Sequence, residues 1–317
     1  MREKLRGTIM VSASGPVRSA VFCTVLILYL LFVATYAGNF SAVVEAVQEY
    51  AMRGQPLRVR NLFPTLPAHG EAVPRAWAAL RNVTQLREWF TDREVAVSVI
   101  PYAANFGREQ KRLTVGKFLA NSTFGATGGN AADGLAEPDY VFDSEFLHDA
   151  DFVQNCSMSN LLPNVQPYAW FLPQCSTDSL PRSPEVEAGL AYMSLLSSLK
   201  AATGQLWHQY YLGPAGSGSP LHYHCQAFNT LTVGEKLWVL VPPSLDISES
   251  DNLAWGYSNV HPLRWLHDNL ERVSRNPDVS ICTQSAGETI FVPSFWSHAT
   301  INLEQTTGYA TEVYNDC

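Results

Sequence analysis

The chain has 317 residues, of which 21 are Lys or Arg and 29 are Asp or Glu, so its formal net charge is −8. This acidic balance argues against nucleic acid as a partner, because binding to phosphate backbones requires a basic surface. Hydrophobic residues make up 46% of the chain and aromatic residues 11%, which is enough to build a substantial buried core.

Residues 20–38 form an apolar run without a single charge, preceded by a basic tail over residues 1–19. This pattern predicts an N-terminal transmembrane helix that acts as a signal anchor, with the tail in the cytosol. Residues 39–54 then form a membrane-proximal segment, and the body of a type II membrane protein lies in the lumen of the endoplasmic reticulum or secretory pathway. The alternative is a cleaved signal peptide, which would leave a secreted protein.

Glycosylation sequons and cysteines agree with a secretory compartment. Asn82, Asn121 and Asn155 each begin an Asn-x-Ser/Thr triplet and are predicted glycosylation sites. Cys156 and Cys175 flank a loop rich in Pro and Asn, and they are the predicted disulfide.

Residues 55–317 are predicted to form one domain, with helices and strands mixed in its first half. The spacing of apolar residues predicts strands at 56–60 and 94–102, helices at 73–90, from 114 and at 184–202, and a surface loop at 123–140.

From residue 206 onward the chain is rich in short β segments. Strands are predicted at 206–213, 219–224, 227–234, 235–243, 288–294, 298–304 and 306–314, separated by turns that contain Gly or Pro. The predicted fold is therefore mainly β with flanking helices, in which residues 206–314 form a barrel or a double-stranded β-helix of the jelly-roll type.

Three histidines are candidate metal ligands. His222 and His224 are one residue apart, so a strand over 219–224 would point both side chains to the same face. His298 follows the turn VPSFWS, from which it could reach across a barrel. Three side chains on a rigid β scaffold, with coordination positions left open, are typical of a catalytic metal site. The alternative is that they are ordinary core or turn histidines.

Residues 212–243 (LGPAGSGSPLHYHCQAFNTLTVGEKLWVLVPP) and 286–303 (AGETIFVPSFWSHATINL) resemble the Jumonji C (JmjC) domain, and weaker similarity extends over most of 55–314. JmjC domains are cupin-fold oxygenases that depend on Fe(II) and 2-oxoglutarate. The resemblance implies that His222 is the first metal ligand and His298 the last. His224 stands where the family has an Asp or Glu ligand.

The resemblance also implies the cosubstrate site. Lys236 matches the lysine that pairs with the distal carboxylate of 2-oxoglutarate, and a buried ammonium does need an anionic partner. Ser219 matches a hydroxyl beside the cosubstrate, while Asn229 and Tyr211 are candidates for pocket walls.

The imidazole of His224 leaves three functions open. The first is a lumenal oxygenase that uses Fe(II) and 2-oxoglutarate to hydroxylate a protein or peptide side chain. The second is a catalytically inactive JmjC-fold binding or scaffold protein of the secretory pathway. The third is a cupin that binds Zn, because three imidazoles also suit that metal. The chain resembles a small group of lumenal JmjC proteins that share this His-x-His pattern.

Overall fold

The computed structural model describes residues 49–50, 53–60, 80–121, 137–146, 206–245 and 258–313. Several predictions fall outside these residues, namely the cytosolic tail, the anchor at 20–38, the helix at 184–202, the glycosylation site at Asn155 and the Cys156–Cys175 disulfide. Among the residues within the described ranges, no helix has the length and apolar character needed to cross a bilayer.

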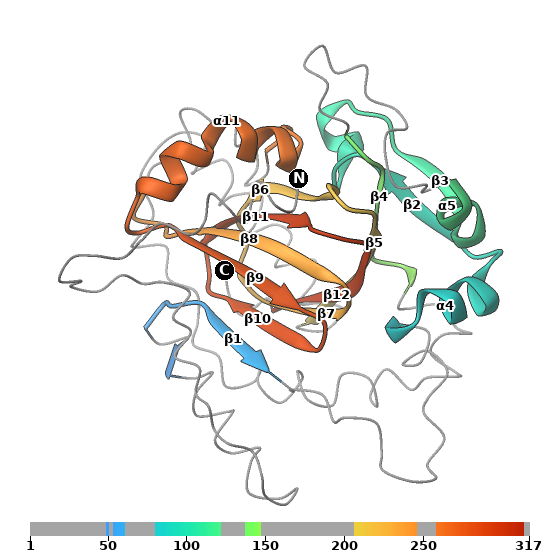
Figure 1. Cartoon of the computed structure of the whole chain (residues 1–317), viewed down its shortest axis with the longest axis horizontal. Helices are drawn as coiled ribbons and strands as arrows, with labels where there is room; N and C mark the ends of the chain where they lie inside the picture. The colour runs from blue at the N-terminus through green and yellow to red at the C-terminus, as the bar shows by residue number, and fades with distance from the viewer. Residues whose placement is uncertain are drawn as a thin grey trace, which may run out of the picture.

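Two antiparallel sheets form the body of the protein (Figure 1). The large sheet contains, in spatial order, β1 (Leu57–Arg60), β10 (Glu288–Val292), β7 (Gln226–Val233), β12 (Thr306–Val313), β5 (Leu206–Gly213), β4 (Tyr140–Asp143), β2 (Glu94–Ser98) and β3 (Lys111–Thr114). The small sheet contains β6 (Gly218–His222), β11 (Ser297–Asn302), β8 (Glu235–Val241) and β9 (Ser280–Ser285). The mainly β fold with flanking helices is thus confirmed.

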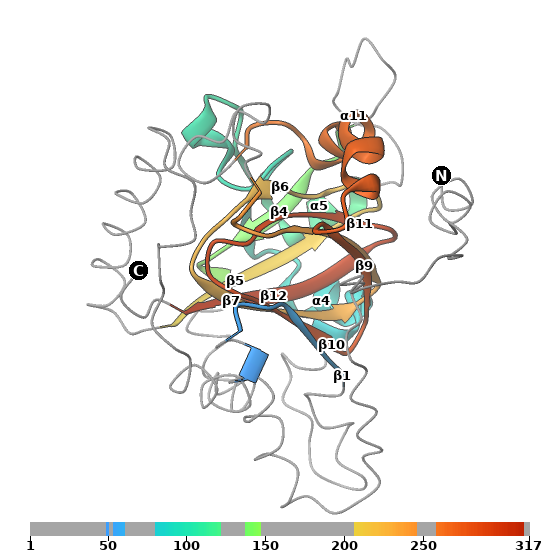
Figure 2. The ribbon, with the colours of Figure 1, turned by 90° about the vertical axis from the view of Figure 1, so that its left-hand side faces the viewer.

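The inner faces of the two sheets pack against each other. Trp238 and Leu240 of β8 form a buried cluster with Ile290 and Val292 of β10. Because side chains alternate along a strand, the neighbouring residues of β8 point outward. These outward residues pack against α11 (Pro262–Arg275), which covers the outer face of the small sheet (Figure 2). The small sheet is therefore buried on both faces.

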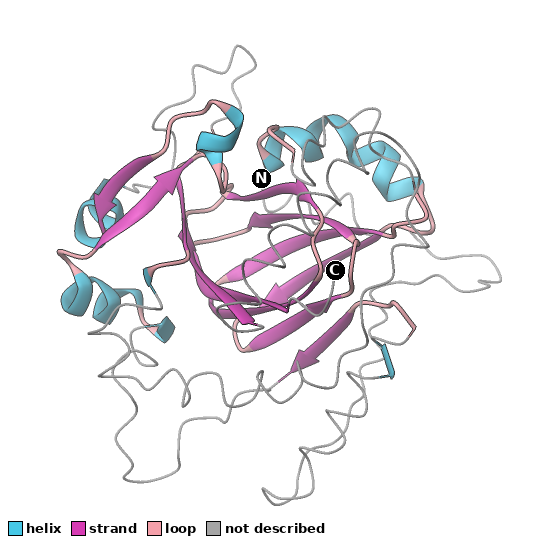
Figure 3. Ribbon diagram, turned by 180° about the vertical axis from the view of Figure 1, so that it is seen from behind, coloured by secondary structure: helices cyan, strands magenta, loops and turns pink. Residues whose placement is uncertain are grey.

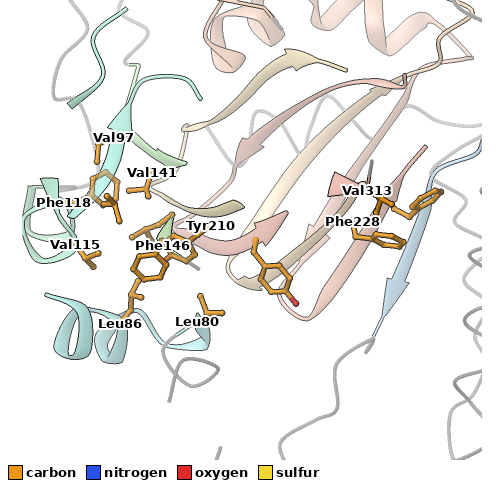
Figure 4. Packing of buried hydrophobic residues seen from close by; sticks show 14 of the residues in the cluster. Leu80, Leu86, Val97, Val115, Phe118, Val141, Phe146, Tyr210, Phe228 and Val313 are labelled. Atoms are coloured by element: carbon orange, nitrogen blue, oxygen red, sulfur yellow. The ribbon is translucent and has the colours of Figure 1, made fainter. Parts of the chain in front are cut away.

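At its β2–β3 end, the outer face of the large sheet is covered by α4 (Val83–Phe90) and α5 (Val115–Asn121), seen from behind in Figure 3. Leu86 of α4, Phe118 of α5 and Tyr210 of β5 belong to one buried cluster, shown in Figure 4. A short 3-10 helix, η1 (Ala103–Phe106), follows β2. This arrangement leaves the inner face of the large sheet free to line the barrel.

One predicted helix is wrong in detail. The helix expected over 73–90 is interrupted at Asn82, which has extended backbone angles (φ −144°, ψ 105°) and caps α4. Its Oδ1 atom accepts hydrogen bonds from the backbone N–H groups of Thr84 (2.9 Å) and Gln85 (3.4 Å). An Asn side chain that satisfies free N–H groups at a helix start favours a new helix over continuation of the old one.

Candidate metal centre

The three histidines predicted from the sequence lie together at the ends of β6 and β11. His222 is the last residue of β6, and its Cα is paired with that of His298 on β11. The ring centroids of these two residues are 4.1 Å apart, and that of His224 is 4.7 Å from His298. One candidate ligand atom from each residue lies within 4.8 Å of the others. Within the described ranges, this is the one cluster of His, Cys, Asp and Glu able to hold a metal ion.

The structure corrects the predicted strand over 219–224. β6 ends at His222, so His224 lies in the following loop and not on the strand face. The loop is nevertheless fixed, because the backbone N–H of Phe295 donates to the carbonyl of His224 at 2.8 Å. The alternation argument was therefore wrong for His224, which nevertheless lies beside His222 and His298.

Each histidine is oriented by a backbone carbonyl that faces its Nδ1 atom. The Nδ1–O distances are 2.8 Å from His222 to Pro220, 2.8 Å from His298 to Trp296, and 2.6 Å from His224 to Cys225. A carbonyl oxygen can only accept, so Nδ1 carries the proton in all three rings. The lone pair of each Nε2 is then available for a metal, which is the arrangement seen in metal-binding histidines.

Burial keeps two of the rings neutral. Desolvation, helped by the nearby His224, lowers the pKa of His222 to about 3. Desolvation and the two other histidines hold the pKa of His298 well below its ordinary value. Both rings are thus neutral at neutral pH, with the proton on Nδ1 and none on Nε2, as metal binding requires.

A buried lysine lies on the same inner face of the small sheet. Lys236 of β8 is paired with Asn302 of β11, whereas Leu240 is paired with His298. The lysine is therefore four residues along the strand from the histidine pair, about 13 Å at the usual rise per residue. Its Nζ atom is 3.5 Å from the centroid of the Tyr211 ring.

Among the described residues, no carboxylate compensates the charge of the Lys236 ammonium. The side chain is only 1% exposed, and desolvation lowers its pKa to about 7. Burying a charge without a partner is costly. A lysine in this position could pair with an anion that enters the barrel.

The other predicted pocket residues lie on β5, β7 and β6. The hydroxyl of Tyr211 is 2.8 Å from both Asn229 Oδ1 and the Thr230 carbonyl, to either of which it can donate. Ser219 is buried, and its backbone N–H donates to Thr300 Oγ1 at 3.1 Å.

The structure adds Thr300 and Asn302, which the sequence analysis did not identify. They follow His298 at every second position of β11 and so lie on the same face. The Oδ1 atom of Asn302 is buried and, among the residues described, has no hydrogen-bond donor. An unpaired buried acceptor beside Lys236 indicates a polar pocket. The pattern H-x-T-x-N in the sequence would have predicted it.

A family model described as "JmjC domain, hydroxylase" matches residues 209–313, a stretch that contains the three histidines and Lys236. Residues 209–313 are a JmjC domain. Similar proteins include human "JmjC domain-containing protein 8", which is 32% identical over 97 residues. That match covers 31% of this chain and 34% of the human protein.

Two further relatives of this JmjC domain are named for oxygenase activity. Human "2-oxoglutarate and iron-dependent oxygenase JMJD4" is 35% identical over 102 residues, covering 30% of this chain and 24% of that protein. "Bifunctional arginine demethylase and lysyl-hydroxylase psr-1" of Caenorhabditis elegans is 36% identical over 107 residues, covering 30% of this chain and 26% of that protein. The chain thus spans about a third or less of the length of these relatives.

Outside the JmjC domain, two predicted glycosylation sites lie on the described surface. Asn82 and Asn121 are both exposed, at the start of α4 and the end of α5. Asn82 uses Oδ1 for its helix cap, so its Nδ2 atom remains accessible. Of the described cysteines, Cys225 is disulfide-bonded and Cys282 is a buried thiol outside any disulfide.

Proposed function

We propose that the protein is an Fe(II)- and 2-oxoglutarate-dependent oxygenase that hydroxylates a protein or peptide side chain in the secretory lumen. The observation that carries the proposal is the buried Lys236 ammonium, which has no carboxylate partner within the described part of the chain and lies on the same barrel face as the histidines. A site that had lost its chemistry would have no need to bury this charge, which costs stability without a ligand.

The donor set fits the proposed groups. His222, His224 and His298 would hold Fe(II) through their Nε2 atoms and leave coordination positions open. Lys236 would bind the distal carboxylate of 2-oxoglutarate, with Tyr211 packed against the ammonium. The spacing between the histidine pair and Lys236 along the strands provides room for a dicarboxylate. Bound iron would supply the oxygen activation that the side chains cannot.

The residues of the pocket have separable tasks. Thr300 and Asn302 offer a hydroxyl and an unpaired carbonyl oxygen beside the cosubstrate position. Trp238 stacks on the His298 ring, with centroids 5.7 Å apart and planes 25° apart, and so fixes its orientation. The apolar residues between the sheets exclude water, which strengthens the attraction between Lys236 and a carboxylate.

The location in the lumen, through an N-terminal anchor or after signal cleavage, belongs to the same proposal. The disulfide at Cys225 supports it, because disulfides persist in oxidising compartments. The exposed sequons at Asn82 and Asn121 support it as well. The predicted test is the sensitivity of the cellular protein to a glycosidase that removes N-linked glycans.

The direct test follows succinate release from 2-oxoglutarate by the full chain, with Fe(II) and ascorbate. The expected result is turnover in the wild type, none in His222→Ala, and a large rise in the 2-oxoglutarate KM for Lys236→Met. A wild-type protein that releases no more succinate than His222→Ala would refute the oxygenase function.

A second candidate is favoured by one observation, the imidazole of His224 in place of a carboxylate ligand. Three neutral histidines also suit Zn, and divalent zinc binds N ligands more tightly than Fe(II) does. A JmjC-fold protein that uses zinc would contain stoichiometric zinc that Fe(II) cannot replace. Metal analysis of the purified protein, before and after Fe(II) reconstitution, distinguishes the two functions.

A further inference from the structure

Glu312 is a buried carboxylate on the inner face of the large sheet. It lies on β12, where its Cα is paired with that of Ala227, and Ala310 two residues earlier is paired with Asn229. Asn229 faces the interior, because its Oδ1 meets the hydroxyl of Tyr211. Residues two apart on a strand share a face, so Glu312 also points inward. Its side chain is 8% exposed.

Glu312 lies at the end of the barrel that carries the histidines. β7 begins at Gln226, two residues after His224, so the paired residue Ala227 is three residues from that histidine. Paired Cα atoms in an antiparallel ladder are about 5 Å apart. The histidine cluster itself does not include Glu312, which therefore lies outside the ligand set.

The charge of the three-histidine centre is what makes this position significant. Two histidines and a carboxylate would leave a bound divalent metal with a net charge of +1, whereas three neutral histidines leave +2. A dipositive centre in a low-dielectric interior is strongly stabilised by a nearby negative charge. Glu312 is the charged residue of β12, whose sequence TTGYATEV is otherwise neutral.

We propose that Glu312 supplies, from outside the ligand set, the negative charge that a carboxylate ligand would bring to the metal. The carboxylate then lies on the facing sheet and not in the coordination sphere. The net charge of the whole site equals that of a site with two histidines and a carboxylate ligand. Glu312 is thus a positioning residue for the metal, and a substitution there changes metal affinity even in the absence of turnover. The inference rests on the proposed metal centre but not on oxygenase activity.

The test measures the affinity of the full-length apo-protein for Co(II) and Zn(II) by competition with a chromophoric chelator. Glu312→Gln removes the charge and keeps the shape, and it is expected to weaken both metals by about tenfold or more. The matched control is Glu304→Gln, which makes the same charge change at an exposed residue between β11 and β12 and should leave affinity unchanged.

The decisive comparison repeats Glu312→Gln in a His224→Asp background. In that background the ligand set already carries a carboxylate, so Glu312 interacts with a net charge of +1. Loss of the Glu312 charge should then weaken metal affinity about threefold instead of about tenfold. A purely structural role for Glu312 would produce the same loss in both backgrounds. Glu312→Asn and Glu312→Asp form a second pair, neutral and charged, for use where Glu312→Gln does not fold.

The outcomes separate this inference from the metal centre itself. Equal metal affinity of wild type and Glu312→Gln, or an equal loss in both His224 backgrounds, overturns the role of Glu312 while the centre stands. Wild-type protein that binds Co(II) and Zn(II) no better than His222→Ala does overturns the centre, and the inference with it.

Discussion

The variant Lys236→Met removes a charge that burial penalises while it keeps the length and most of the volume of the side chain. Lysine has an ordinary pKa of 10.5, and desolvation lowers the pKa of Lys236 to about 7 in the folded protein. Each pKa unit corresponds to about 1.4 kcal/mol, so holding the protonated side chain in the barrel costs up to about 5 kcal/mol. Without a ligand, Lys236→Met should therefore be more stable than wild type, by up to about 5 kcal/mol at pH 6.5.

The pH dependence fixes the sign of this effect. Because the folded pKa is lower than the unfolded one, the unfolded chain binds more protons between pH 7 and 10.5. The free-energy cost of burying the charged Lys236 side chain is complete below pH 7 and shrinks as the pH rises. The wild type therefore gains stability relative to Lys236→Met between pH 7 and 10.5.

The assay is urea denaturation of both proteins at pH 6.5, 7.5, 8.5 and 9.5, in the presence and absence of 2-oxoglutarate. The control is Lys117→Met, which removes a charge from an exposed position on α5 and should change stability little at any pH. Added 2-oxoglutarate should stabilise the wild type and not Lys236→Met. The reasoning is refuted if Lys236→Met is less stable than wild type at pH 6.5, or if the difference between them does not change with pH.

Three further predictions concern other parts of the structure. Dialysis against a chelator should lower the melting temperature of the wild type and leave that of His222→Ala unchanged, because a metal stabilises only the state that binds it. Asn82→Ala should remove the cap of α4 and lower the free energy of unfolding by about 1 kcal/mol. Thr84→Ala should remove the sequon and keep the cap. Urea denaturation measures the loss of stability, and gel mobility measures the loss of the glycan. Gly308→Ala should prevent 2-oxoglutarate binding in a thermal-shift assay, because its Cβ would clash with the Thr230 backbone carbonyl and with the hydroxyl of Tyr211, whose ring contacts Lys236.

Much of the barrel could be predicted from the sequence, because several strands in its second half are bounded by Gly or Pro turns. The strand predicted at 206–213 matches β5, and those at 227–234 and 306–314 match β7 and β12 within one residue. β9 was missed, since SICTQS mixes polar and apolar residues without a clear period. α11 was also missed, although Pro262 at its first position and its apolar spacing are helix signals.

The cluster of candidate metal ligands could be predicted from residue type and spacing, but the orientation of the rings could not. Nothing in the sequence shows that a backbone carbonyl faces the Nδ1 of each histidine, because those contacts depend on how the backbone turns beside each of these residues. Glu312 was overlooked for a related reason, since its proximity to the site follows from the register between β12 and β7. Strand register brings together residues that are far apart in the chain, and local sequence patterns do not predict it.

The pairing of His222 with His298 across β6 and β11 bears on when the protein could bind the proposed metal. Both ligands are fixed by the hydrogen-bond ladder of the sheet, and their rings are neutral with the proton already on Nδ1. Metallation then requires neither folding nor proton release from these two residues, so it can follow folding as a separate, reversible event. The identity of the bound ion would accordingly be decided by the metals free in the compartment where the finished protein resides.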